Sequence, residues 1–179
     1  MISRKYLSDY RIDAQVGPGG GIKSQAVYIG ARYALSPAVT ASDKRILLYS
    51  SALSVLAYVG ALIPKLLAAR TIYVLAPFAF SALPLSLTLL TVIDFSRIKG
   101  PMTRIEADRC SNRLPACPIM TVALSGGAMT ALVINAIATK PEIITGDVIF
   151  TVASLTLSAL SILISAKTRK IKPIKYEDS

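Results

Sequence analysis

The sequence predicts an all-α membrane protein with four transmembrane helices, arranged as two helical hairpins, and a small N-terminal cytoplasmic β-hairpin. Of its 179 residues 53% are hydrophobic and the mean hydropathy is +0.56, which is more apolar surface than a small soluble domain can bury. The run 71–93 carries no charge. At about 1.5 Å per helical residue it can cross a hydrocarbon core about 30 Å thick. The basic residues, finally, gather in three polar segments.

The first polar segment, residues 1–45, contains no apolar run of the kind that forms the centre of a signal peptide. From Tyr10 to Val16 apolar and polar residues alternate strictly, which is typical of a half-buried strand. The glycine-rich stretch 17–21 interrupts this pattern, and 23–33 is again rich in β-forming residues. We therefore expect a β-hairpin over 10–33. Its candidate docking residues are Tyr10, Ile12, Val27, Tyr28, Ile29 and Tyr33.

Four apolar runs give the expected spans 46–64, 71–93, 119–138 and 146–166. The second contains two prolines, which transmembrane helices tolerate because neighbouring groups satisfy the freed carbonyls, and we expect a kink there.

The central loop 94–118 is polar, and within it Thr103 and Glu106 have the spacing of a capping box. This spacing predicts a short amphipathic surface helix that begins near Thr103. The C-terminal tail 167–179 is basic and shows no helical or strand periodicity, so we expect it to be irregular.

The distribution of charge predicts the topology. The N-terminal segment, the central loop and the tail hold seven, five and five basic residues, whereas the two short loops that join the helices of each hairpin hold three. The positive-inside rule therefore places both termini and the central loop in the cytoplasm, with the spans in the cell membrane. Anionic lipid headgroups, rather than nucleic acid, are the expected counterpart of the net charge of +10.

Small and hydroxyl-bearing residues recur at helical spacing within the spans. We expect them to mark close helix contacts, with a polar path for a solute as the alternative. The Ser-Gly-Gly sequence in the third span also fits an unwound binding segment. The amide of Asn135 requires a partner in a neighbouring helix. The candidate packing residues are Ser50, Ser54, Ser125, Gly126, Gly127, Asn135, Ser154, Ser158 and Ser161.

Several chemical functions find no support in the sequence. The stretch 17–24 approaches a phosphate-binding loop, but Ile22 stands where that loop requires glycine. Cys110 and Cys117 lack zinc-site spacing, and the chain has no histidine, so we expect two free thiols, with a regulatory disulfide as the alternative. No charge lies in the middle of a span, which argues against ion-coupled carriers and proton pumps but not against a passive pore.

These observations favour a non-catalytic accessory or structural subunit of a membrane assembly or homo-oligomer, with no cofactor and no metal. The alternative is a small passive transporter or channel for a neutral or weakly polar solute, lined by the serines and Asn135. A third hypothesis is an enzyme that acts on lipid and holds a headgroup phosphate with the basic residues between Arg104 and Arg113.

Overall fold

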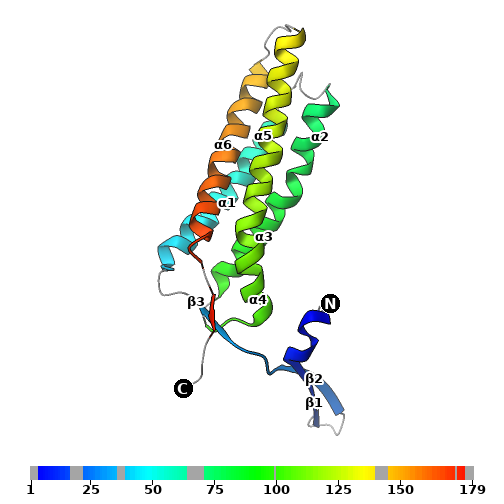
Figure 1. Ribbon diagram of the computed structural model, residues 1–179, viewed down its shortest axis with the longest axis vertical. Coiled ribbons are helices and arrows are strands. Elements are labelled where there is room, and N and C mark those ends of the chain that lie inside the picture. Colours follow the sequence, from blue (N-terminus) through cyan, green and yellow to red (C-terminus); the bar gives the residue numbers. More distant parts are fainter. Residues whose placement is uncertain are drawn as a thin grey trace.

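The computed structural model describes residues 4–16, 22–35, 39–63, 71–98, 100–139, 145–171 and 173–175. Four long apolar helical stretches lie side by side, and a small two-stranded sheet lies near the N-terminus (Figure 1). Each of the four is long and apolar enough to cross a membrane: Ala41–Leu62, Ile72–Arg97, Arg104–Ala138 and Gly146–Thr168. The prediction of a mostly helical chain with four apolar helices and an N-terminal strand pair is confirmed.

The helices form an up-and-down bundle. Helix α1 (Ala41–Leu62) packs against α6 (Thr145–Thr168) and α3 (Ala82–Arg97). Helix α5 (Leu114–Thr139) packs against α6, α3 and α2 (Ile72–Phe80). The four helical stretches thus run alternately up and down, with α2 and α3 forming one of them, as in up-and-down four-helix bundles generally (Figure 1).

The second stretch is interrupted where the prolines predict. Helix α2 contains Pro77 and ends at Phe80, and α3 begins at Ala82. Pro84 has no amide hydrogen to donate to the carbonyl of Phe80, so the hydrogen-bond ladder is broken at this point.

The first helix begins earlier than its apolar run. Thr40 and Asp43 form a capping box, and α1 starts at Ala41 rather than near Ile46. The first turn is polar and was therefore not counted with the apolar span.

The central loop departs most from its expected form. The capping box of Thr103 and Glu106 is present and starts α4 (Arg104–Asp108). The helix does not end there, because a π-helical segment, η3 (Arg109–Arg113), carries it into α5. Its charged residues resemble a loop, yet the buried Ala107, Cys110 and Leu114 recur at helical spacing and give the segment an apolar stripe.

The N-terminal hairpin is present over residues 10–28. Strand β1 (Tyr10–Val16) pairs antiparallel with β2 (Ile22–Tyr28), so that Tyr10 lies opposite Tyr28. The short 3-10 helix η1 (Arg4–Asp9) precedes it. The predicted turn 17–21 and the two loops expected between helices lie outside the described residues, apart from the ends of those loops.

A second strand pair corrects two expectations. Strand β3 (Tyr33–Leu35) pairs antiparallel with β4 (Pro173–Lys175), with Ala34 opposite Ile174. Tyr33 therefore belongs to this pair and not to the hairpin, and the described part of the tail is not irregular. Tyr33 also exchanges both backbone hydrogen bonds with Met102, at 2.9 and 2.7 Å. The three-residue strands are too short to show a period in the sequence.

The chain leaves the hairpin at Gly30. The amides of Ile29 and Gly30 both donate to the carbonyl of Asp9, at 2.9 and 3.2 Å. A Cβ added at Gly30 would lie 2.8 Å from Cβ of Asp9 and from Oη of Tyr28, so this approach requires glycine.

Two separate apolar clusters form the core. We call the end of the bundle where α1 begins and α3 and α6 end the basic end, and the opposite end the far end. The cluster at the basic end consists of Leu47, Val92, Phe95, Met102, Cys110, Leu114, Ile164 and Ile171. The cluster at the far end consists of Ala61, Val74, Phe78, Leu85, Ala128, Phe150 and Leu157.

Candidate functional site

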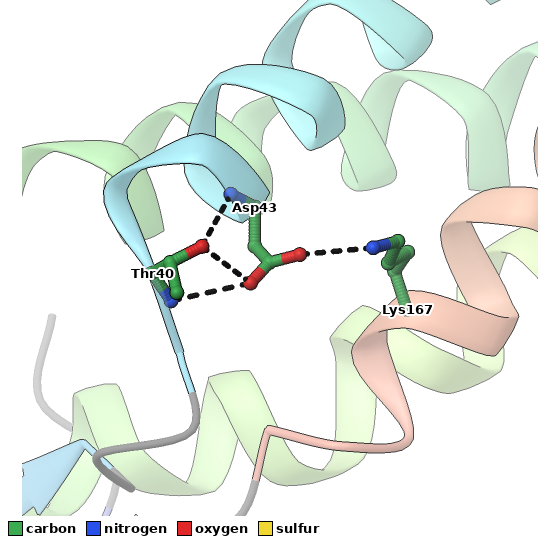
Figure 2. Close-up of polar contacts among 3 residues, drawn as sticks. All are labelled: Thr40, Asp43 and Lys167. Carbon is green, nitrogen blue, oxygen red and sulfur yellow. Dashed lines mark hydrogen bonds and ion pairs between the residues drawn. The ribbon is translucent and has the colours of Figure 1, made fainter.

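The basic end joins segments that are far apart in the sequence. Asp43, in the first turn of α1, accepts a hydrogen bond from Nζ of Lys167 in the last turn of α6, at 3.0 Å (Figure 2). The other carboxylate oxygen of Asp43 accepts from the backbone amide and the hydroxyl of Thr40, at 3.2 and 2.8 Å (Figure 2). One carboxylate thus caps α1 and connects it to α6.

The neighbouring residue connects α1 to a different helix. Nζ of Lys44 donates to the carbonyl of Ile98 at the end of α3, at 2.6 Å, and lies 5.4 Å from the ring centre of Phe95. A cation at a helix C-terminus interacts favourably with the helix dipole and with the unpaired carbonyls there. The first turn of α1 is therefore held to both of the helices that end beside it.

The hairpin is attached to α4 by polar contacts at its base. Oη of Tyr6 donates to Asp108 at 2.7 Å, and the guanidinium of Arg104 lies 3.7 Å from the carboxylate of Asp9. Oη of Tyr28 accepts from the amide of Arg104 at 2.9 Å and donates to the carbonyl of Ala31 at 2.7 Å. These contacts place the hairpin beside the basic end (Figure 1).

Two apolar side chains of the hairpin, and the one that follows β2, are exposed. Ile12, Ile29 and Val27 are 74%, 57% and 36% exposed. Within β1, the guanidinium of Arg11 donates a hydrogen bond to the carboxylate of Asp13, at 2.8 Å. This hydrogen bond, together with the attraction between the two charges, raises the pKa of Arg11. Within the described residues, β1 and β2 pair only with each other, so each has an unpaired edge.

The three tyrosines predicted as docking residues have other surroundings. The rings of Tyr10 and Tyr28 meet edge to face at 5.2 Å, and both side chains are half-buried. Tyr28 is committed to attaching the hairpin, and Tyr33 packs against the core at the basic end. The apolar candidates Ile12, Val27 and Ile29 are thus the exposed ones.

Most of the predicted packing serines lie inside the bundle. Ser54, Ser125, Ser154 and Ser161 are buried, and Ser158 and Ser50 are half-buried. The hydroxyl oxygens of Ser125 and Ser158 lie 2.9 Å apart and join α5 to α6. The hydroxyl of Ser54 instead donates to the carbonyl of Ser50 within α1, at 2.8 Å.

The two glycines of the third span do not mark a close contact. A Cβ added at Gly126 or Gly127 would meet nothing within 4 Å outside its own helix. Helix α5 also passes through both residues without a break, so the Ser-Gly-Gly sequence is not unwound.

The remaining polar candidates have clear positions. Oη of Tyr73 on α2 donates to the side-chain oxygen of Asn135 on α5, at 3.3 Å, which supplies a partner in a neighbouring helix. Cys110 and Cys117 are free and buried. Within the part of the chain that the structure describes, no group of three or more Cys, Asp or Glu side chains could hold a metal ion.

The contacts at the basic end were not anticipated from the sequence. One signal was present, because Thr40 and Asp43 have the same spacing as Thr103 and Glu106 and mark a helix start. Nothing in the sequence pairs Asp43 with Lys167 or Tyr6 with Asp108, since these contacts depend on tertiary structure.

Comparison with protein-family models, with curated proteins and with solved structures finds no match.

Proposed function

We propose that this protein is a non-catalytic accessory subunit of a membrane assembly, and that it holds a docking strand pair at a fixed position beside the bilayer. One observation carries the proposal. The hairpin is attached to α4 at its base, by Tyr6, Asp9 and Tyr28, while Ile12 and Val27 on its two strands are exposed. Exposed apolar side chains on a held strand pair suit a binding surface.

The expected mode of binding is addition of a strand to the exposed edge of β1 or β2. Backbone hydrogen bonds would supply affinity in this mode, and the side chains of Ile12 and Val27 would supply specificity. An isolated two-stranded sheet is only marginally stable in water, so a third strand would also stabilise the hairpin.

We further propose that the basic end faces the cytoplasm of the cell, with the bundle in the cell membrane. The support is the charge asymmetry of the sequence, together with the presence of Lys44, Arg97, Arg104, Arg109 and Lys167 at one end of the bundle. Anionic headgroups on that side would attract these residues.

Purification in a mild detergent tests the subunit proposal. We expect a partner in fixed stoichiometry, lost with Ile12→Asp and retained with the control Leu7→Asp, which alters an exposed residue of η1 outside the hairpin. Purification of the wild type alone, under conditions that preserve other membrane complexes, would contradict the proposal.

A second candidate function is passive transport of a small neutral solute through the bundle. The observation that favours it is the hydroxyl of Ser154, which is fully buried and has no hydrogen-bond partner among the described residues. Buried polar groups are usually paired, and an unpaired one is explained by a ligand or water that the group can bind.

Solute efflux from proteoliposomes tests the second candidate. If the bundle conducts, Ser154→Val and Asn135→Leu should slow efflux, whereas Ser86→Val, on an exposed face of α3, should not. Efflux equal to that of protein-free liposomes would exclude this function and leave the subunit proposal standing.

A further inference from the structure

A pocket of about 450 Å³ lies at the basic end, between the end of α3 and the helical segment α4–η3. Its lining includes Asp94, Phe95, Arg97, Glu106, Arg109 and Cys110. Phe95 and Cys110 are buried and belong to the apolar cluster at the basic end, so the pocket is lined by both buried apolar and charged side chains.

The charges around the pocket balance. Two guanidinium groups, of Arg97 and Arg109, and two carboxylates, of Asp94 and Glu106, line it. A surface that offers equal numbers of cations and anions complements a ligand that carries both charges better than one that carries a single charge.

These charged groups are only loosely engaged. Arg109 and Asp94 lie 3.6 Å apart, which is longer than a hydrogen bond between charged groups, and are 48% and 59% exposed. Glu106 uses one carboxylate oxygen to cap α4, where it accepts from the amide of Thr103 at 2.8 Å. The groups therefore keep donors and acceptors for a ligand.

The position of the pocket is that of a lipid headgroup. The apolar part of α3 ends at Ile93, and Asp94 and Arg97 follow directly, so the pocket opens where the hydrocarbon core would give way to the polar layer.

The pocket also coincides with an irregular helix. Arg109 and Cys110 both belong to the π-helical segment η3, and both line the pocket. Single π-helical turns within α-helices are rare and are frequent at functional sites. This feature is independent of the charge pattern.

We propose that this pocket binds a phosphoethanolamine group, with the phosphate at Arg97 and Arg109 and the ammonium at Asp94 and Glu106. Guanidinium groups suit phosphate because their donors form paired hydrogen bonds to its oxygens. A primary ammonium donates three hydrogen bonds to carboxylates, whereas the trimethylated ammonium of phosphocholine donates none. The site does not depend on the docking function of the hairpin.

Native mass spectrometry of the full-length protein, with added lipids of identical acyl chains, tests the proposal. We expect phosphatidylethanolamine to bind about tenfold more tightly than phosphatidylcholine, since one charged hydrogen-bonding group distinguishes the two. Phosphatidylglycerol should also bind more weakly, because it lacks a cation for the carboxylates.

Two substitutions separate the two halves of the site. Arg97→Gln should weaken binding of phosphatidylethanolamine about tenfold, whereas Arg169→Gln, which alters another exposed arginine at the basic end, should leave it unchanged. Asp94→Asn should reduce the preference for phosphatidylethanolamine over phosphatidylcholine. Arg97 and Arg169 form no ion pair with another described residue, so the variants Arg97→Gln and Arg169→Gln should both fold.

Soluble phosphoethanolamine identifies the source of the ligand. Binding of the lipid alone assigns the site to the bilayer, and competition by the soluble compound that depends on Arg97 extends the same site to the free molecule. Equal affinity for the ethanolamine and choline lipids, a preference for phosphatidylglycerol, or binding that is unchanged by Arg97→Gln would each overturn the proposal.

Discussion

The two ends of the bundle are held together by different interactions. At the basic end, Asp43, Lys44 and Arg104 connect segments that are distant in the sequence through ion pairs and hydrogen bonds. At the far end, the ring of Phe78 stacks on Tyr58 and meets Phe150, with both pairs of ring centres 4.8 Å apart. Side-chain hydrogen bonds also join helices in this part of the bundle, from Tyr73 to Asn135 and between Ser125 and Ser158.

This difference is the one expected of helices that are long and apolar enough to cross a membrane and would meet two solvents. Lipid tails are as apolar as a buried side chain, so within the bilayer helices associate through close packing rather than through the hydrophobic effect. Aromatic stacking and shape complementarity can therefore hold the far end. Near water, exposed ion pairs contribute little individually, and the basic end accordingly uses several.

The comparison predicts that loss of packing at the far end has the largest effect. Phe78→Ala removes the ring that contacts both Tyr58 and Phe150 and should lower the free energy of unfolding by about 3 kcal/mol. Unfolding in mixed detergent micelles, followed by circular dichroism, measures this change. Phe80→Ala, on an exposed face of the same helix, is the control, and an equal loss in both variants would contradict the packing account.

At the basic end, the largest effect is expected at Gly30. A methyl group there would collide with Asp9 and Tyr28, so Gly30→Ala should cost about 1–3 kcal/mol and detach the hairpin from α4. Limited proteolysis should then cleave the N-terminal 35 residues faster while the bundle stays intact. Gly100→Ala is the matched control, because a Cβ at Gly100 meets nothing within 4 Å. Cleavage at the wild-type rate would show that the close approach at Gly30 is not needed.

The four apolar helices and the helix start at Thr103 were the parts that the sequence could predict. Length and hydropathy depend on local composition, so the four helices were found, and the capping box at Thr103 and Glu106 marked a true helix start. The interruption between α2 and α3 followed from Pro77 and Pro84. Each of these features is set by residues that lie within a few positions of one another.

The features that escaped prediction depend on contacts across the chain. The pairing of Tyr33–Leu35 with Pro173–Lys175 joins segments near opposite termini, and neither strand is long enough to show alternation. The sequence from Arg104 to Leu114 resembles a loop because its charged residues outnumber its buried ones. Gly126 and Gly127 favour a close helix contact because small residues allow two helices to approach. No other helix lies close to either glycine in the structure.

A smaller effect is expected from Tyr28→Phe, which tests how much the hydroxyl of Tyr28 contributes to attaching the hairpin to α4. The substitution removes the hydroxyl that accepts from the amide of Arg104 and donates to the carbonyl of Ala31. The expected cost is about 1 kcal/mol, and the amide of Arg104 should exchange with deuterium faster. Tyr10→Phe removes a hydroxyl from the neighbouring ring and is the control, so equally fast exchange in both variants would show that the effect does not depend on the hydrogen bonds of Tyr28.

The smallest effect is expected from the partly exposed ion pair between Asp43 and Lys167. Asp43→Asn and Lys167→Gln each remove the ion pair between α1 and α6, while asparagine can still accept from Thr40 and cap α1. At low salt, each single variant should melt slightly below the wild type, and the double variant should melt no lower than the less stable single variant. These differences in melting temperature should become smaller as the salt concentration is raised. Additive losses that salt leaves unchanged would mean that the two side chains act separately, and the basic end would then depend on packing as the far end does.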